Sequence, residues 1–549
     1  MILLKQGTYN VGGTLRISSG SSTDVITVAN YNDESVTIDG RIEICNGTAA
    51  CDGRRGNVLV EGVTIESDTE GYVIYLANNG ATAIDNVTFK NVAIYGGVTE
   101  AIRIQSNMTN ITFENSVLDG GYNNHVMKIL CNDTSNEPTS CTYVPDNIIV
   151  KNNTFSKVSN MFSDVCAVVS DGGSEDLIQL EGAGYVEITN NTFSSNPFED
   201  CLDIKGEGYS GAGLLIKNNY IDSTGQSSQA CSESFTGCKI EGLIIHGSQH
   251  TGDVQIEGNY FEHGSNRFRT LSNNVKITNN IFDGSRAVIE DNDAKFWFNT
   301  MTGASTCATQ AQTDCNELEL GGTDTVDNLS IINNIINGSL IDYNSGQYTT
   351  VNNIIYNTTG NTLGSCTGCT TSGNLSINPV LTNTFRIGTS SPAYNSANDS
   401  YTISNDSLGS QRPQGTDYDI GAFEYIAAAP VCGNGVVESG ETCDDGNTIS
   451  SDGCSATCQT ESSGGGSSGG SSSGDSSSSE SSTICGPLDS NGNNQVDITD
   501  FSSFAKKYSK TCADTNASYS GCGKLDVNND NKITLVDFAN FAYKYGKSC

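Results

Sequence analysis

The chain has 549 residues, of which 36% are hydrophobic, and it contains 60 Gly, 8 Pro and a single Trp. This length allows one large domain with smaller additions, and the high Gly content is typical of a turn-rich all-β protein. The formal net charge of −36 excludes nucleic acid as a partner, because phosphates are bound by basic surfaces. An acidic chain instead favours calcium and solubility outside the cell.

The 20 Cys fall in locally even groups, which indicates disulfides and an oxidising compartment. Close pairs are Cys45 with Cys51, Cys131 with Cys141, Cys231 with Cys238, Cys307 with Cys315, and Cys366 with Cys369. Cys166 and Cys201 remain for a bridge between adjacent repeats. No signal peptide or transmembrane run is visible. Because the chain opens directly on the strand-like MILLKQGTY, we expect that a targeting segment has been removed or that the sequence is incomplete at this end.

The first 425 residues alternate short strands and turns. We expect residues 1–57 to cap an open end of the repeat, and regular coils to begin near Val58. One Asn recurs at a matched site of successive repeats, and such amides can bond up and down a stack. The matched residues are Asn153, Asn191, Asn219, Asn259, Asn280, Asn299, Asn334 and Asn353. This ladder is interpreted as structural and not as a binding site.

Charged side chains recur at matched positions from Asp176 to Asp293. The segments alternate apolar and polar residues, so one set points inward: Ile178, Leu180, Leu202, Ile204, Leu243, Ile245, Ala287 and Ile289. If each repeat is one coil, the outward residues stack in columns about 4.8 Å per step. The Lys205 column reads Glu181, Lys205, His246, Arg269 and Glu290, and the Asp203 column reads Gln179, Asp203, Ile244, Arg267 and Val288. Structural ion pairs on a solvated face would give the same pattern.

Residues 1–425 resemble the right-handed parallel β-helix of the pectate lyase superfamily. The resemblance rests on the repeated VEITNNTF, LLIKNNYI, VQIEGNYF and VKITNNIF segments and on the closing stretch from Asn378 to Tyr425. It implies an all-β solenoid and a secreted protein, and it leaves the chemistry open.

Residues 430–461 read CGNGVVESGETCDDGNTISSDGCSATCQ and closely resemble the Myxococcus cysteine-rich repeat of extracellular proteins. The four cysteines, Cys432, Cys443, Cys454 and Cys458, are expected to form two disulfides, because the module is too small for its own core. The acidic run Asp444, Asp445 and Asp452 is interpreted as a solvated loop in preference to a cation site. Residues 462–484 form a flexible Ser/Gly linker.

Residues 485–549 contain a duplicated loop, DSNGNNQVDITDF and DVNNDNKITLVDF, each followed by a helix pattern. The spacing of the oxygen donors predicts two Ca²⁺ sites. The ligand positions are Asp489, Asn491, Asn493, Gln495, Asp497 and Asp500 in the first loop and Asp526, Asn528, Asp530, Lys532, Thr534 and Asp537 in the second, Gln495 and Lys532 offering carbonyl oxygens.

This module resembles a dockerin, which implies a small α-helical domain that anchors the protein to a cohesin-type partner. Asn494 and Asn531 stand where the family usually has Gly, and Asn tolerates the left-handed backbone, so we expect weakened binding. The expected location is extracellular, with attachment to a scaffold or cell surface.

The two columns contain the groups that β-elimination of an acidic polysaccharide needs: a neutraliser for the uronate carboxylate, a base and an acid. We assign Glu181, Asp200 and Asp203 to a third Ca²⁺, Lys205 as the base, His246 and Arg269 as acid or neutraliser, and Gln179, Arg267 and Glu290 to substrate binding.

The segments around Lys205 and His246 also resemble the calcium-dependent alginate and dermatan lyases of the β-helix class. Those enzymes place an Arg-His-Gly turn on the coil after the Lys, whereas this chain has Ile245 in the position of the Arg. The departure leaves the proton donor open between His246 and Arg269.

The pattern of Glu199, Asp200 and Asp203 is similar to the calcium cluster of another pectate lyase family, in which a Lys further along the chain is the base. Lys239 stands at that place. We rank Lys205 above it, because Lys239 lies beside Cys238 in an expected loop.

Three functions fit these observations. The first is a dockerin-anchored polysaccharide lyase, which should produce unsaturated uronides. The second is a glycoside hydrolase or uronate epimerase, which gives new reducing ends or changed stereochemistry without unsaturation. The third is a non-catalytic glycan-binding adhesin or surface scaffold, since the β-helix hosts many functions.

Overall fold

The structure is a computed structural model. It describes residues 1–17, 24–44, 56–78, 83–121, 124–131, 143–156, 176–194, 200–205, 213–223, 241–246, 252–269, 274–302, 317–321, 326–342, 346–356, 368–427, 430–437, 441–450 and 453–461. The chain divides into two compact units, Met1–Ala429 and Pro430–Cys549. The linker and dockerin predictions for residues 462–549 lie outside the described residues.

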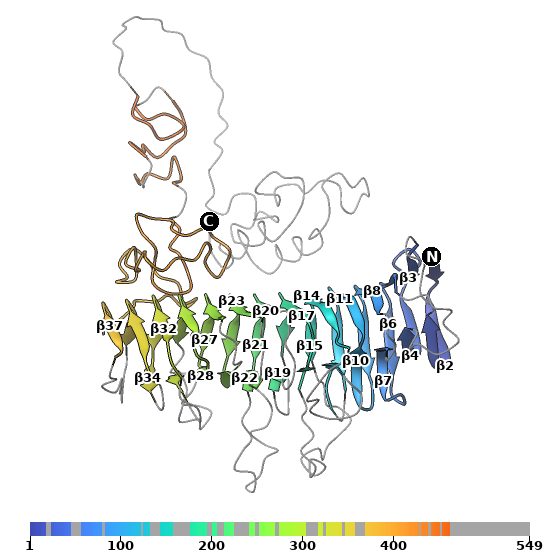
Figure 1. Cartoon of the computed structure of the whole chain (residues 1–549). Coiled ribbons are helices and arrows are strands. Elements are labelled where there is room, and N and C mark those ends of the chain that lie inside the picture. Colours follow the sequence, from blue (N-terminus) through green and yellow to red (C-terminus); the bar gives the residue numbers. More distant parts are fainter. Residues whose placement is uncertain are drawn as a thin grey trace, which may run out of the picture. The chain divides into compact units, whose positions relative to one another are not determined.

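The first unit is a solenoid of parallel β-strands, as the sequence predicted (Figure 1). Its first line of strands forms a 14-stranded sheet. The members are β1 (Ile2–Leu4), β3 (Ile26–Asn30), β5 (Val58–Glu61), β8 (Ile84–Lys90), β11 (Met108–Glu114), β14 (Asp146–Lys151), β17 (Tyr185–Thr189), β20 (Gly213–Lys217), β23 (Asp253–Glu257), β26 (Val275–Thr278), β29 (Lys295–Trp297), β32 (Leu329–Ile332), β35 (Tyr348–Val351) and β37 (Thr370–Ser372).

The second and third lines join at the long strands β2 (Gly7–Ile17) and β4 (Val36–Ile44), since β4 pairs with both β6 and β7. The second line contains β6 (Thr64–Ser67), β9 (Ala93–Gly96), β12 (Val117–Gly120), β15 (Thr154–Ser156), β18 (Thr192–Phe193), β21 (Tyr220–Asp222), β24 (Tyr260–Glu262), β27 (Ile281–Asp283), β30 (Thr300–Thr302), β33 (Ile335–Asn337) and β36 (Ile354–Tyr356). The third line contains β7 (Tyr72–Asn78), β10 (Glu100–Ser106), β13 (Met127–Leu130), β16 (Ile178–Glu181), β19 (Asp200–Lys205), β22 (Glu241–His246), β25 (Ser265–Phe268), β28 (Arg286–Ile289), β31 (Glu317–Leu320) and β34 (Ser339–Asp342).

Parallel pairing begins earlier than the sequence analysis placed it. Strand β1 already pairs with β3 and β3 with β5, so residues before Val58 belong to the stacked coils. The reason is that this segment follows the same apolar alternation as the later repeats, with Val28 and Ile38 buried.

Apolar side chains fill the interior of the solenoid. The inward residues predicted for the Asp176–Asp293 stretch are all 3% exposed or less. Phenylalanines from successive coils stack on each other, Phe89 on Phe113 at 4.9 Å and Phe261 on Phe282 at 5.0 Å between ring centroids. Each buried Phe contributes roughly 1.5–3 kcal/mol relative to an exposed one, so the repeated inward column is the main source of stability.

The predicted asparagine ladder is present. Each Nδ2 donates to the Oδ1 of the next ladder Asn at 2.9–3.2 Å, and Asn374 extends the series beyond Asn353. The same Nδ2 also donates to a backbone carbonyl at 2.8–3.0 Å. A residue with positive φ precedes each ladder Asn, for example Asn218 at 55° and Gly258 at 67°. Asn and Gly adopt this conformation at low cost, so the turn and the ladder require the same short sequence.

Replacing Asn259 with Ala is expected to lower the free energy of unfolding by about 2–4 kcal/mol. Asn259 is fully buried, and the change removes the acceptor of the Asn219 N–H and the donor to the Ile216 carbonyl. Each buried polar group left without a partner costs about 1–3 kcal/mol. Guanidinium unfolding would measure the loss. Asn378→Ala is the control, because Asn378 is exposed, and equal midpoints for the two variants would contradict a stabilising ladder.

The closing stretch, residues 378–425, contains no regular strand and covers part of the solenoid. Ile387 and Ile420 pack into a cluster with Phe298, Ile335 and Ile354. Arg412, which is buried, donates to the Glu424 carboxylate within the stretch at 2.7 Å and to Asn279 Oδ1 of the solenoid at 3.2 Å. The segment therefore belongs to the first unit by its packing.

Cysteine pairing agrees only in part with the sequence analysis. Cys131 and Cys369 are disulfide-bonded. Cys201 is a free, buried thiol, so the bridge predicted between Cys166 and Cys201 is wrong. The physical reason is its place in β19, where the side chain points into the apolar interior, and burial raises the pKa of this thiol well above its usual range.

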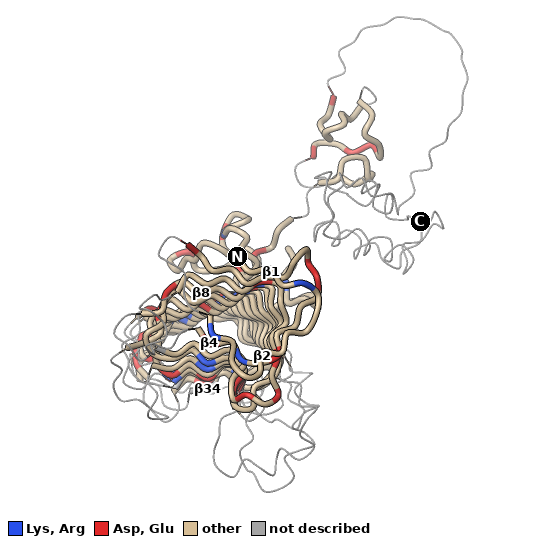
Figure 2. Tube along the Cα trace, turned by 90° about the vertical axis from the view of Figure 1, so that its right-hand side faces the viewer, with Lys and Arg blue, Asp and Glu red and all other residues tan. Residues whose placement is uncertain are grey.

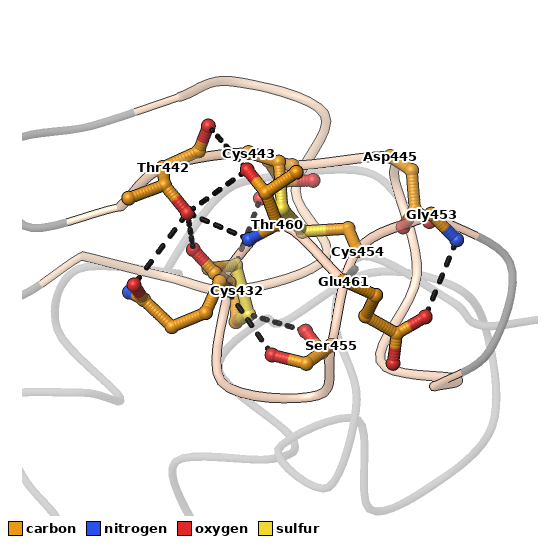
Figure 3. Close-up of a disulfide and its surroundings, with 12 residues drawn as sticks. Cys432, Thr442, Cys443, Asp445, Gly453, Cys454, Ser455, Thr460 and Glu461 are labelled. Carbon is orange, nitrogen blue, oxygen red and sulfur yellow. Dashed lines mark hydrogen bonds between the residues drawn. A yellow bond between two sulfur atoms is a disulfide. The ribbon is translucent and has the colours of Figure 1, made fainter. Parts of the chain in front are cut away.

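In the second unit, Cys432–Cys458 and Cys443–Cys454 form the two predicted disulfides (Figure 3). Asp444 accepts hydrogen bonds from the N–H groups of Gly433, Asn434, Gly435 and Gly446. These hydrogen bonds, that from Gly446 most strongly, lower the pKa of the Asp444 carboxyl. This carboxylate therefore organises the loop between the disulfides.

No helix in the described part of the chain is long and apolar enough to cross a membrane.

Candidate active site

The strand register of the third line brings the two predicted columns together. Glu181 pairs with Lys205 and Lys205 with His246. In the neighbouring column, Gln179 pairs with Asp203, and Arg267 lies between Ile244 and Val288. Figure 2 shows Lys and Arg (blue) and Asp and Glu (red) on the strands stacked with β34. The alternation of single residues was sufficient to predict this arrangement.

Arg269 and Glu290 continue the Lys205 column just beyond the ends of β25 and β28. The Arg269 N–H donates to the Ile245 carbonyl at 3.1 Å, and the Glu290 N–H donates to the Phe268 carbonyl at 2.8 Å. Both residues therefore keep the parallel pattern, and Arg269 stays partly exposed.

Three buried carboxylates, which we call the carboxylate cluster, lie beside Lys205. The members are Asp176, Asp200 and Asp203, and an oxygen atom of each lies within 4.8 Å of the others. Their exposed fractions are 0%, 7% and 2%. Gln179 Nε2 donates to Asp203 Oδ2 at 3.2 Å and to Asp176 Oδ2 at 3.4 Å. Asp200 and Asp203 thus lie on β19, Asp176 lies just before the adjacent strand β16, and Gln179 of β16 bonds to two of the three carboxylates.

The donor set of the carboxylate cluster fits Ca²⁺. This ion takes about six to eight oxygen ligands at about 2.3–2.6 Å, so two of its ligands stand no more than about 5 Å apart. The cluster meets that spacing. Like charges buried together are unfavourable unless a cation balances them, which makes a bound divalent ion a physically consistent occupant.

Lys205 supplies a positive charge at the edge of the cluster. Its Nζ lies 2.9 Å from Asp203 Oδ2, and its side chain is 28% exposed. Burial acts to lower the pKa of Lys205, but the charge and hydrogen bond of Asp203, with Asp176 and Glu181, outweigh burial and raise it. The ammonium form is therefore favoured while only these carboxylates face it.

Glu181 lies beside Lys205 in the register but outside the carboxylate cluster. Its Oε1 forms an ion pair with Lys128 Nζ on the preceding coil at 3.2 Å. Its Oε2 is buried and has no hydrogen-bond partner among the described residues. Asp176, which the sequence analysis did not assign, takes the place in the cluster that was expected for Glu181. Aligning DLIQLEG with DCLDIKG places Asp176 beside Asp200 and would have found it.

The other assigned residues occupy different environments. Gln179 is only 1% exposed and holds the carboxylates, so its assignment to substrate binding remains a prediction. Arg267 Nε lies 3.8 Å from Glu290 Oε2. The side chains of His246, Glu199 and Lys239, and all of the dockerin ligands, lie outside the described residues.

Ion pairs continue along this face in both directions from the cluster. Arg103 pairs with Glu100 at 3.2 Å toward the amino-terminal coils, and Arg286 pairs with Glu319 on the other side. These pairs show that part of the charged strip has a structural role, as the alternative interpretation expected. The carboxylate cluster differs from them, because three negative groups meet there.

Residues 418–459 match the family described as a domain of unknown function (DUF4215). The match covers most of the cysteine-rich module and begins before the boundary between the two units. A comparison with curated proteins gives no match. The chain is similar to the crystal structure of pectate lyase Pel9A, with 14% identity, 77% of this chain and 88% of that chain covered, and a TM-score of 0.38. It is also similar to PfbA, a surface adhesin of Streptococcus pneumoniae, with 16% identity, 68% and 83% covered, and a TM-score of 0.36.

Proposed function

We propose that this protein is a secreted, calcium-dependent polysaccharide lyase that cleaves a uronate-containing polysaccharide by β-elimination. The observation that supports the proposal most is the carboxylate cluster of Asp176, Asp200 and Asp203, with Lys205 in contact with it. A cation site next to a basic side chain is the combination that this reaction uses.

In the proposed reaction, Asp176, Asp200 and Asp203 would hold Ca²⁺, whose positive charge would neutralise the uronate carboxylate and make the α-proton more acidic. A cation held by the neighbouring carboxylates would also lower the pKa of Lys205 and so favour its neutral form. Neutral Lys205 would then accept the α-proton, the bond from C4 to the leaving oxygen would break, and a C4–C5 double bond would form. His246, one coil further on, or Arg269, two coils further on, would give a proton to the leaving oxygen. Arg267 and Glu290 lie beside this path and are assigned to holding the chain.

The dockerin-like module is proposed to bind two Ca²⁺ ions and a cohesin-type domain, and so to anchor the enzyme to a scaffold or cell surface. The support for this part is the duplicated ligand spacing at Asp489 and Asp526. Loss of cohesin binding without loss of cleavage, after deletion of residues 485–549, would separate anchoring from catalysis.

The base is tested with the variant Lys205→Met. Removing a general base lowers the turnover rate by about 100-fold or more, so the variant should show little rise in the ultraviolet absorbance of unsaturated uronides. Uronic-acid polymers should be assayed with calcium and with a chelator. Lys151→Met is the control, because Lys151 pairs with Glu114 on the first line of strands.

Lys239→Met is run in parallel, because Lys239 is the second candidate for the base. Activity lost in that variant and kept in Lys205→Met would transfer the role to Lys239. New reducing ends without unsaturation would instead support a hydrolase, and binding without any product would support an adhesin. Either of these two results would overturn the lyase proposal.

A further inference from the structure

A cleft of about 630 Å³ lies between the solenoid and the closing stretch. Its walls come from the ends of β20 and β23, from Tyr220 and Tyr260 on the second line of strands, and from residues 383–386 and 405–409. The carboxylate cluster is on the third line, so the two sites occupy different strand lines. The volume is within the range of about 300–1,000 Å³ that small-ligand sites occupy.

Aromatic rings form one wall of this cleft. Tyr220 and Tyr260 are stacked, with centroids 5.6 Å apart and an interplanar angle of 23°. Phe385 of the closing stretch lies 6.1 Å from Tyr260 in a tilted arrangement. The residue paired with Tyr220 on the preceding coil is Thr192, so the aromatic stack ends at Tyr220, whose side chain is 36% exposed.

The rings are held in position by their own contacts. The Tyr220 hydroxyl donates to the Glu262 carboxylate, and the Tyr260 hydroxyl donates to Asp283 Oδ2 at 2.7 Å. Phe385 has a φ of 60°, a conformation that bulky residues rarely adopt. Because these rings are already fixed, a ligand that stacks on them pays little entropic cost for ordering side chains.

Polar groups surround the aromatic wall. Lys217 Nζ pairs with Glu257 at 3.1 Å. Arg386 is exposed, lies over the Phe423 ring at 5.3 Å, and forms no ion pair with any described residue. At Gly258, with a φ of 67°, a Cβ atom would approach Asn218 Oδ1 to 2.5 Å, so the close packing at this point of the cleft wall requires glycine.

We propose that this cleft is a second saccharide-binding site, in which a pyranose unit stacks its C–H face on Tyr220 and directs its polar substituents toward Arg386 and Lys217. A sugar ring combines an apolar face with a polar edge, and this wall offers both surfaces side by side. A purely apolar ligand would leave the cations unused. The inference stands independently of the proposed lyase activity, because it uses none of the residues of the carboxylate cluster.

The test is calorimetric titration of the full chain with a cello-oligosaccharide and with an oligogalacturonate, in the presence of a chelator so that calcium sites do not contribute. We expect one or both sugars to bind, and Tyr220→Ala to weaken binding by about tenfold, the size of effect that aromatic stacking gives. Tyr220→Phe keeps the ring and should bind within about threefold of the original chain. Arg386→Ala distinguishes the two sugar types, because it should weaken the oligogalacturonate, which adds a carboxylate for the guanidinium, more than the neutral cello-oligosaccharide.

Tyr95→Ala is the matched control, because Tyr95 lies on the same line of strands, is 39% exposed and is not part of the cleft. If Tyr220→Ala does not fold, Phe385→Ser in the closing stretch tests the same wall. Unchanged binding in the cleft variants, equal loss in Tyr95→Ala, or no binding of either sugar would overturn the proposal.

Discussion

Asp203→Asn is expected to abolish calcium-dependent cleavage, with a loss of turnover of about 10³-fold. Asp203 is the member of the carboxylate cluster that also contacts Lys205, through Oδ2 at 2.9 Å. The amide has the same shape but no charge, so the cluster would hold a divalent ion with one negative ligand fewer. Removing one preorganised electrostatic group from an active site costs about 10²–10³-fold in rate, and here a cation site and the position of the lysine are lost together.

Calcium titration of the activity is the measurement that separates this role from a structural one. Asp203→Asn should require far more calcium, whereas a merely destabilised protein would keep the original calcium midpoint with less active material. Asp253→Asn is the control, because Asp253 is exposed on the first line of strands. Unchanged calcium dependence in Asp203→Asn would mean that the carboxylate cluster is not the metal site.

The repeat made the fold predictable from the sequence. Inward residues such as Leu202 and Leu243 and ladder residues such as Asn219 and Asn259 are short-range patterns, and each coil repeats the same physical requirement. Because the side-chain period of a strand is two, the facing of every residue follows once the coils are aligned. For the same reason the neighbours of Lys205 in its column could be read from the sequence.

Contacts that depend on the direction of a side chain were not predictable in the same way. Glu181 stands next to Lys205 in the register, yet its carboxylate turns to Lys128 on the coil before. Asp176 precedes its strand, so the alternation that marks strand residues did not include it. The cleft beside Tyr220 was missed for a different reason, because its other wall comes from residues far along the chain.

Arg412→Met is expected to lower the free energy of unfolding of the first unit by about 3–5 kcal/mol, the typical cost of leaving one member of a buried ion pair alone. The Arg412 and Glu424 side chains are both 0% exposed. The guanidinium also donates to Asn279 Oδ1 at 3.2 Å and to the Gly421 carbonyl at 2.6 Å, and it lies 4.7 Å from the Phe298 ring centroid. The Arg412 side chain therefore bonds both within the closing stretch and to the solenoid.

The decrease in the free energy of unfolding caused by Arg412→Met should be larger above pH 6 than below it. Burial raises the pKa of Asp419 to about 6, and Arg412 is among the groups that oppose this rise. A carboxyl with a raised pKa in the folded state contributes stability that is lost as the pH rises through that value, so removing the nearby cation enlarges the penalty at neutral pH. Guanidinium unfolding on both sides of pH 6 would measure the difference.

Two comparison variants make the interpretation of Arg412→Met specific. Arg16→Met should cost no more than about 1 kcal/mol, because Arg16 is 63% exposed and its pair with Glu43 is screened by solvent. The double change Arg412→Met with Glu424→Leu should cost less than Arg412→Met alone, since it leaves no unpaired charge at that position. If the double variant were instead the less stable one, the stretch would be held by packing around Ile387 and Ile420 and not by the buried charge.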